Sequence, residues 1–331
     1  MPAGLRPAGF VYSGIIFPAM TAPHFDSPYH APVLVAEVLA VLGQPVRVLD
    51  GTLGGGGHSL ALLAAGAHVT ALDRDPAAIA TARVRLAAYE QRGQFRAVLG
   101  NYSALDSLPE VAGATFDGIL LDLGVSSHQF DDESRGFSFR EGAILDMRMG
   151  GANGQTAAEL LNTADERDLA RILREYGDEP RGLRIAREIV RRREQRPFVI
   201  SDDLVGAIRA VLGPRSGAPD FARLFQAVRI AVNDELEGLA RALPALRDRL
   251  VPGGVIAVIA YHSGEDRLVK HAFREWSLEC ICPPKQVMCT CRGHALGALV
   301  KRKPIDAGTE EIARNSRARS AHLRAWRAAG T

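Results

Sequence analysis

The chain has no apolar run near twenty residues, few cysteines and almost no net charge. A helix needs about twenty apolar residues to cross a bilayer, so we expect no membrane-spanning segment. Four cysteines in 331 residues do not indicate a secreted protein stapled by disulfides, and we expect a cytoplasmic location. The formal net charge is +2, so any affinity for nucleic acid must come from local clusters of basic residues.

The first 27 residues differ from the rest of the chain. Residues 10–20 are mildly apolar, but this run is too short, and too weakly preceded by positive charge, for a secretory signal. We predict a disordered N-terminal extension over residues 1–27, with weak tertiary contacts or none for residues 1–26. Met20 is an alternative first residue, and the intact mass of the native protein distinguishes the two starts.

A glycine-rich turn with the sequence DGTLGGGGHS occupies residues 50–59, between apolar runs at residues 45–49 and 68–72. Glycine lacks a Cβ atom, so such a turn can bend sharply and let a ligand contact the main chain. The second run ends at Asp73, where a carboxylate is placed to accept hydrogen bonds from ribose hydroxyls. The pattern predicts a nucleoside pocket, and a flexible loop is the alternative.

The spacing of the glycines argues against a nicotinamide oxidoreductase. Gly54, Gly56 and Ser59 miss the G-x-G-x-x-G pattern of dinucleotide sites by one residue. The order D-G-T-x-G-x-G instead resembles the cofactor loop of S-adenosylmethionine methyltransferases. The turn at residues 250–254 and the apolar run at 255–260 resemble the fifth strand of Rossmann-like methyltransferases.

Short apolar runs alternate with helical patterns as far as Leu121, which predicts an α/β fold with a mostly parallel, doubly wound sheet. Between Leu123 and about Phe225 the strand-like runs stop and helical patterns continue. We therefore predict a Rossmann-like methyltransferase domain interrupted by an all-helical substrate-recognition domain. The predicted bounds are 28–124 and 226–331 for the first domain and 125–225 for the second. The last two strands are predicted at residues 298–302 and 321–327.

Two clusters of basic residues are candidates for contact with a phosphate backbone. Arg184, Arg187 and Arg191 fall on one face of a predicted helix. A second cluster follows Ala298 and continues to the C-terminus. Such stripes suit RNA, where affinity comes mainly from charge neutralisation, but an ordinary solvated face is the alternative for each.

Longer segments resemble the ribosomal small-subunit methyltransferase H family, also called MraW. They run in order from His30 to the C-terminus and include DGTLGGGGHS at 50–59, ALDRDPAAI at 71–79, DGILLDLGVSSHQFDD at 117–132, LDMRM at 145–149, FQAVRIAVNDEL at 225–236 and YHSGEDRLVK at 261–270. The resemblance implies methylation of the exocyclic N4 amine of a cytidine in the decoding region of 16S rRNA. It implies S-adenosylmethionine as cofactor and the small ribosomal subunit as partner, and it leaves monomer and homodimer open.

The resemblance also carries over individual cofactor contacts. It assigns Gly56, Gly57 and His58 to the methionine part of the cofactor and Asp73 to its ribose. The remaining matched positions are Tyr102, Asp122 and Gln129. This chain departs from the family at Tyr261, where phenylalanine is usual, at Gly264, where leucine is usual, and at residues 219–223.

In this reaction the cytosine amine needs activation by the protein more than the sulfonium methyl donor does. Conjugation with the ring makes a cytosine amine a poor nucleophile, and acceptors aimed at its N–H groups favour the developing positive charge. The D-P-P-Y motif of DNA amine methyltransferases does not occur, and residues 122–127 take its place. We predict that Ser126 or a backbone carbonyl contacts the amine. His262 is a candidate base or phosphate contact, although a structural role is the alternative.

Two further groups have more than one interpretation. Asp146 and Arg148 either contact the nucleotide or pair with each other. All four cysteines form the pattern C-x-C-x6-C-x-C between Cys280 and Cys291. We predict reduced thiols in a surface loop and no metal, because C-x-C is tighter than the usual C-x2-C of zinc sites, and zinc is the alternative. For the chain as a whole, an RNA-binding assembly factor without turnover and a DNA amine methyltransferase are the competing functions.

Overall fold

The computed structural model describes residues 25, 31–126, 129–130, 132–151, 154–283, 286 and 288–330. No helix within these ranges combines the length and the apolar character needed to span a membrane. Of the predicted N-terminal extension, residues 1–24, 26 and 27 lie outside the described residues. Phe25 is described, and its side chain is buried while its carbonyl accepts a hydrogen bond from Arg85. The prediction of weak contacts is therefore wrong at Phe25.

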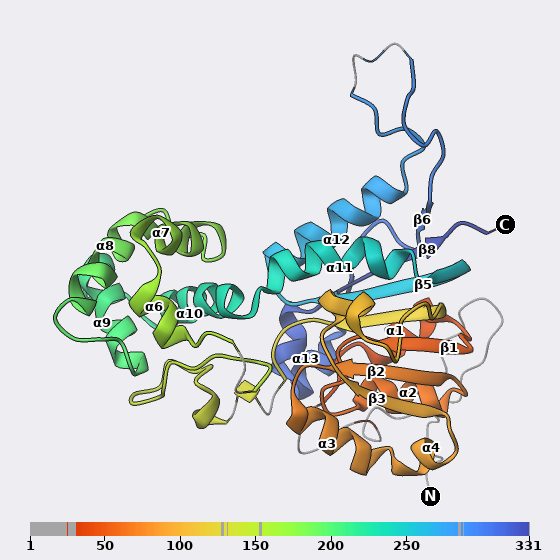
Figure 1. Cartoon of the computed structure of the whole chain (residues 1–331), viewed down its shortest axis with the longest axis horizontal. Coiled ribbons are helices and arrows are strands. Elements are labelled where there is room, and N and C mark those ends of the chain that lie inside the picture. The colour runs from red at the N-terminus through yellow and green to blue at the C-terminus, as the bar shows by residue number, and fades with distance from the viewer. Residues whose placement is uncertain are drawn as a thin grey trace, which may run out of the picture.

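A single sheet contains all eight strands, in the order β3-β2-β1-β4-β5-β8-β6, with β7 paired to β8 (Figure 1). The first five strands in this order are parallel, whereas β8 is antiparallel to β5, β6 and β7. The strands are β1 Arg47–Asp50, β2 His68–Asp73, β3 Phe95–Leu99, β4 Phe116–Asp122, β5 Leu250–Ala260, β6 Gly297–Leu299, β7 Ile305–Asp306 and β8 His322–Ala328. The predicted α/β class with a mostly parallel sheet is confirmed, but β7 was not predicted.

Helices cover both faces of the sheet. On one face lie α1 Val35–Leu42, α2 Gly57–Ala64 and α3 Pro76–Arg85, and on the other lie α11 Glu235–Arg247 and α12 Ser263–Trp276. Strand β4 shows why, because Ile119, Leu120 and Leu121 are all fully buried and alternate between the two apolar clusters. A strand buried on both faces needs a continuous apolar run, which is the pattern its sequence has. Shorter elements are α4 Ala87–Gln91, α13 Thr309–Arg314 and the 3-10 helices Tyr102–Ser107, Glu133–Arg135 and Ser316–Ser320.

A group of five helices lies apart from the sheet and has its own apolar cluster (Figure 1). These helices are α6 Ala157–Thr163, α7 Glu166–Glu175, α8 Gly182–Arg193, α9 Ser201–Leu212 and α10 Ala218–Asn233. The boundary predicted after Phe225 falls inside α10, and Val228 still packs in the helical cluster. One continuous helix thus crosses the predicted boundary and carries the chain from the helical group to Asn233 at the sheet.

Candidate active site

Three strands end in an aspartate at the same edge of the sheet. Asp50, Asp73 and Asp122 are the last residues of β1, β2 and β4, and the parallel register brings these ends together. The edge lies where the strand order reverses between β1 and β4, which is where ligands bind in open α/β sheets. A pocket opens there, lined by residues of the glycine turn, the strand ends and the segments that follow them: Gly51, Thr52, Gly54, Gly57, His58, Asp73, Arg74, Tyr102, Asp122, Gly124, Ser126, Gln129, Met149, Asn233, Glu235, Tyr261 and Glu265.

The glycine turn is shaped by two residues in the left-handed backbone region. Gly54 has a φ of 50° and Gly56 a φ of 73°, and side chains other than hydrogen are strained there. Gly57 begins α2, and a Cβ atom at this position would lie 2.7 Å from Pro32. Gly57 and His58 line the pocket, whereas Gly56 shapes the turn and packs towards Leu86.

Asp73 holds the turn and faces the pocket at the same time. Its two carboxylate oxygens accept backbone N–H groups of Gly54 and Asp75, each at 2.8 Å. Each carboxylate oxygen can accept a second hydrogen bond, so the group keeps capacity for a ligand. Burial raises the pKa of Asp73 to about 6, although the two backbone N–H groups lower it in part.

Asp50 differs from Asp73, because its carboxylate oxygens accept hydrogen bonds from residues of the turn itself. It is fully buried and accepts hydrogen bonds from the Ser59 hydroxyl at 2.7 Å and the Thr52 N–H at 3.2 Å. Thr52 in turn accepts the backbone N–H of Asp122 at 2.6 Å, which joins the turn to the end of β4. Asp50 is absent from the pocket lining, so its role in the motif is to order the loop.

Asp122 sits between a histidine and a tyrosine. Its Oδ2 lies 3.4 Å from Nε2 of His58, and its Oδ1 accepts the Tyr261 hydroxyl at 2.8 Å. Burial alone lowers the pKa of His58, but the neighbouring carboxylate of Asp122 outweighs it, so the net shift is upward. The Tyr261 hydroxyl gives Asp122 a donor that a phenylalanine at this position would lack.

Ser126 and Gln129 are bonded to each other. The Ser126 hydroxyl accepts a hydrogen bond from the backbone N–H of Gln129 at 3.1 Å. The side-chain Oε1 of Gln129 in turn accepts one from the backbone N–H of Ser126, also at 3.1 Å. The Gln129 amide donates to Asp75 at 2.8 Å. Gln129 therefore fixes the pocket wall. Ser126 lines the pocket, and one of the two lone pairs on its hydroxyl oxygen accepts the Gln129 N–H. Ser127, in the same predicted segment, lies outside the described residues.

Sequence reasoning missed two residues that connect the pocket to the helical group. The Asn233 side chain accepts the Met149 N–H at 2.8 Å and donates to the Met147 carbonyl at 2.7 Å. Arg74, directly after Asp73, donates to the Asn233 carbonyl at 3.1 Å. Both residues lie in the matched segments 71–79 and 225–236, but neither type signals such a role from sequence.

A profile of the MraW methylase family matches residues 27–329. The chain belongs to this family. A relative from Gemmatimonas aurantiaca, described as ribosomal RNA small subunit methyltransferase H, is 67% identical over 301 residues, which cover 91% of this chain and 96% of that protein. A relative of the same description from Heliobacterium modesticaldum is 46% identical, and the match covers 90% of this chain and 97% of that protein.

Solved structures to which the chain is similar are more distant. An rRNA methylase from Streptococcus thermophilus has a TM-score of 0.39 at 10% identity, covering 89% of this chain and 93% of that one. The N-methyltransferase NodS from Bradyrhizobium japonicum, in complex with S-adenosyl-L-homocysteine, has a TM-score of 0.39 at 9% identity. The match covers 89% of this chain and 85% of NodS. The resemblance deduced from the motifs is thus confirmed by the family match, and the chain is a methyltransferase.

The pocket suits the charge of the family's cofactor. Five carboxylates line it, those of Asp73, Asp122, Asp234, Glu235 and Glu265. S-adenosylmethionine carries a positive sulfonium and a positive amino group, and acidic walls favour such a ligand. The buried Nδ1 of His58 also has no hydrogen-bond partner among the described residues, which leaves donor or acceptor capacity next to the turn.

His262 has the position expected of the structural alternative. It is the N-cap of α12, and its Nε2 lies 3.2 Å from a carboxylate oxygen of Glu265. It lines a second cavity, between α7, α10, α11 and α12, together with Gly264. A Cβ atom at Gly264 would lie 3.1 Å from the His262 ring. The structure thus gives His262 a capping role and does not place it in the lining of the cofactor pocket.

The predicted arginine face lies on α8, but two of its three arginines form ion pairs with glutamates. Arg184, Arg187 and Arg191 are all exposed on α8. Arg187 lies 3.0 Å from Glu166, and Arg191 lies 2.7 Å from Glu188.

Asp146 and Arg148, in the LDMRM segment, were predicted either to contact the nucleotide or to pair. They form a two-pronged ion pair at 2.9 and 2.6 Å. The hydrogen bond and charge of Arg148 outweigh the effect of burial and lower the pKa of Asp146. Their pairing is the interpretation that the structure supports.

Proposed function

We propose that this chain transfers a methyl group from S-adenosylmethionine to the exocyclic N4 amine of a cytidine in the decoding region of 16S rRNA. The substrate is the small ribosomal subunit, and the site of action is the cytoplasm. The observation that carries the proposal is the family match over residues 27–329, combined with the glycine turn and Asp73 at the switch point of the sheet. The descriptions of the close relatives as small-subunit methyltransferases support the choice of RNA.

The cofactor supplies an electrophilic methyl group on a sulfonium, and the residues of the chain orient it. Asp73 would accept hydrogen bonds from the ribose hydroxyls, and Gly57 and His58 would contact the methionine part. Tyr102, which lines the pocket from the segment after β3, would supply an aromatic contact. Holding donor and acceptor in line supplies much of the rate enhancement in such a displacement, because the leaving group needs little help.

The acceptor side of the pocket begins with Ser126. Its hydroxyl already accepts one N–H from Gln129 and retains a second lone pair for the cytosine amine. The target base must leave its stack to reach this site, as in other enzymes that act on bases. The acidic pocket then favours the positive charge that develops on the amine nitrogen during transfer.

The arginine face of α8 is the proposed RNA contact. Arg184 has no carboxylate partner among the described residues, so its charge is the most available of the three. Replacing Arg184 with alanine is expected to weaken binding to the subunit and to reduce the slope of log affinity against log salt by about 1. The exposed Arg92, which stacks on Tyr89 beside β3, is the matched control. An unchanged salt slope for Arg184→Ala would remove this face from the interface.

The test of the function is a methylation assay with mapped products. Small subunits from cells lacking the activity are incubated with the chain and a labelled methyl donor, and the modified base is then identified. Label on N4 of a single 16S cytidine supports the proposal. No label despite subunit binding would indicate an assembly factor, and label in duplex DNA would indicate the DNA enzyme. Light scattering on the purified chain then distinguishes monomer from homodimer.

A further inference from the structure

The described residues of the segment between α12 and β6 form no apolar cluster of their own. The segment begins at Ser277 and ends at Leu296, and its described residues project away from the body of the molecule beyond α12 (Figure 1). Leu278, Ile281 and Met288 are exposed, at 51%, 44% and 75%, and among the described residues of the segment only Leu296, at its end, packs against an apolar cluster of the sheet. Small units without buried apolar surface are usually held by disulfides or by a metal.

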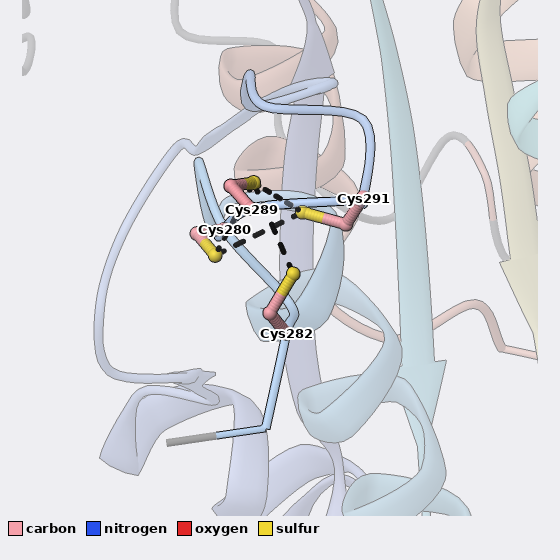
Figure 2. Close-up of side chains that lie close together, drawn as sticks. All are labelled: Cys280, Cys282, Cys289 and Cys291. Carbon is pink, nitrogen blue, oxygen red and sulfur yellow. Dashed lines mark hydrogen bonds between the residues drawn. The ribbon is translucent and has the colours of Figure 1, made fainter. Parts of the chain in front are cut away.

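All four cysteines of the chain meet inside this segment. Figure 2 shows their sulfur atoms turned towards a common centre. The Sγ atom of Cys289 lies 3.8 Å from that of Cys280, 3.9 Å from that of Cys282 and 3.4 Å from that of Cys291. The Sγ atoms of Cys280 and Cys291 are 3.8 Å apart, and all four lie within 4.8 Å of one another.

These separations match a metal tetrahedron and not a disulfide. A Zn–S bond of about 2.3 Å places the corners of a regular tetrahedron about 3.8 Å apart. A disulfide would bring one pair to about 2.05 Å, and all four cysteines are free. The four closest Sγ–Sγ separations run from 3.4 to 3.9 Å, close to the tetrahedral spacing, so small side-chain movements suffice for the four sulfurs to surround one ion.

Backbone groups around the sulfurs support a thiolate cluster. The N–H of Ile281 points at the Sγ of Cys291 at 3.3 Å, and the N–H of Thr290 points at the Sγ of Cys282 at 3.4 Å. Such outer hydrogen bonds orient the ligands of metal sites. Arg292 closes the base of the segment, with bonds to Glu275 at 2.6 Å and to the Leu278 carbonyl at 3.1 Å.

We propose that Cys280, Cys282, Cys289 and Cys291 bind one Zn²⁺ as a closed tetrathiolate site. Four sulfur ligands in a tetrahedron favour zinc or iron among the common metals, and a site with no open position is structural. The ion takes the place of an apolar core and fixes the projecting segment. The sequence-based expectation of free thiols rested on the tight C-x-C spacing. In the structure the pair Cys280 and Cys282 lies on one stretch of the segment and the pair Cys289 and Cys291 on another (Figure 2). The short spacing within each pair therefore does not prevent the four sulfurs from forming a tetrahedron.

The test is metal analysis of the full chain, purified reduced and without chelator. We expect one zinc per chain by plasma mass spectrometry, and loss of most of it in Cys291→Ser. Met288→Ser is the control, because it also replaces a sulfur-containing side chain with serine, next to Cys289 and at an exposed position, but removes no thiol, and it is expected to keep the metal. Cofactor affinity, measured by calorimetry on each variant, reports that the rest of the fold is intact.

A second measurement keeps the proposal testable if zinc is lost during purification. Reduced metal-free protein is titrated with Co²⁺, which gives intense sulfur-to-metal absorption in a tetrathiolate site. Saturation at one equivalent, and displacement by Zn²⁺, support the proposal. No zinc and no cobalt spectrum would overturn it, as would disulfides found by mass in the freshly purified chain or iron in place of zinc.

Discussion

Replacing Asp73 with asparagine tests the cofactor site most directly. The side chain keeps its size, but it loses its charge and one of its two acceptor oxygens. One of the backbone N–H groups of Gly54 and Asp75, now each at 2.8 Å from a carboxylate oxygen, would face an amide NH₂ instead. The ribose hydroxyls also lose a charged acceptor. A hydrogen bond to a charged group contributes about 1.5–3 kcal/mol, so the Kd for S-adenosylmethionine is expected to rise about 10- to 150-fold.

The assay is calorimetric titration of the cofactor into the wild type and the variant. Asp117→Asn is the matched control, because Asp117 also accepts a backbone N–H, that of Arg47 at 2.8 Å, at the opposite end of β4. The control should bind the cofactor as the wild type does. A Kd for Asp73→Asn within about twofold of wild type, in a protein that melts cooperatively, would refute the assignment, because it is below the smallest effect of such a bond.

Four further outcomes are expected. Burial raises the pKa of Asp73 to about 6, so cofactor affinity should fall as the pH drops through 6, and this dependence should vanish in Asp73→Asn. The raised pKa also means that the folded state binds this proton more tightly than the unfolded state, so this group stabilises the fold as the pH falls from 7 towards 4; a pH series of urea midpoints, wild type against the variant, checks the sign. Tyr261→Phe removes the hydroxyl donor to Asp122 and should lower the free energy of unfolding by about 1 kcal/mol, and an unchanged urea midpoint would contradict it. Asn233→Ala leaves the N–H of Met149 without a partner, so it should cost about 3 kcal/mol in unfolding and weaken cofactor binding, whereas Asn162→Ala should destabilise the helical group and leave cofactor binding intact.

Local patterns in the sequence were sufficient for the sheet and for the cofactor edge. The apolar run of β4 indicated a strand buried on both faces, and Ile119 to Leu121 are buried in this way. The glycine turn and Asp73 at the end of β2 were predicted from local pattern, and the strand order in the structure brings the aspartates that end β1, β2 and β4 to one edge. Backbone requirements such as the left-handed φ of Gly54 and Gly56 also have a local signature.

Long-range partners had no such signature. Sequence spacing did not show that Tyr261 donates to Asp122, that Arg74 donates to the carbonyl of Asn233, or that Asn233 joins α10 to residues 147–149. Nor did it show that four sulfurs from the two sides of one projecting segment meet at the spacing of a metal tetrahedron. The sequence by itself determined the elements and the type of pocket, since propensity and periodicity act over a few residues. Only the tertiary structure decided which polar groups face each other, because that depends on contacts between residues distant along the chain.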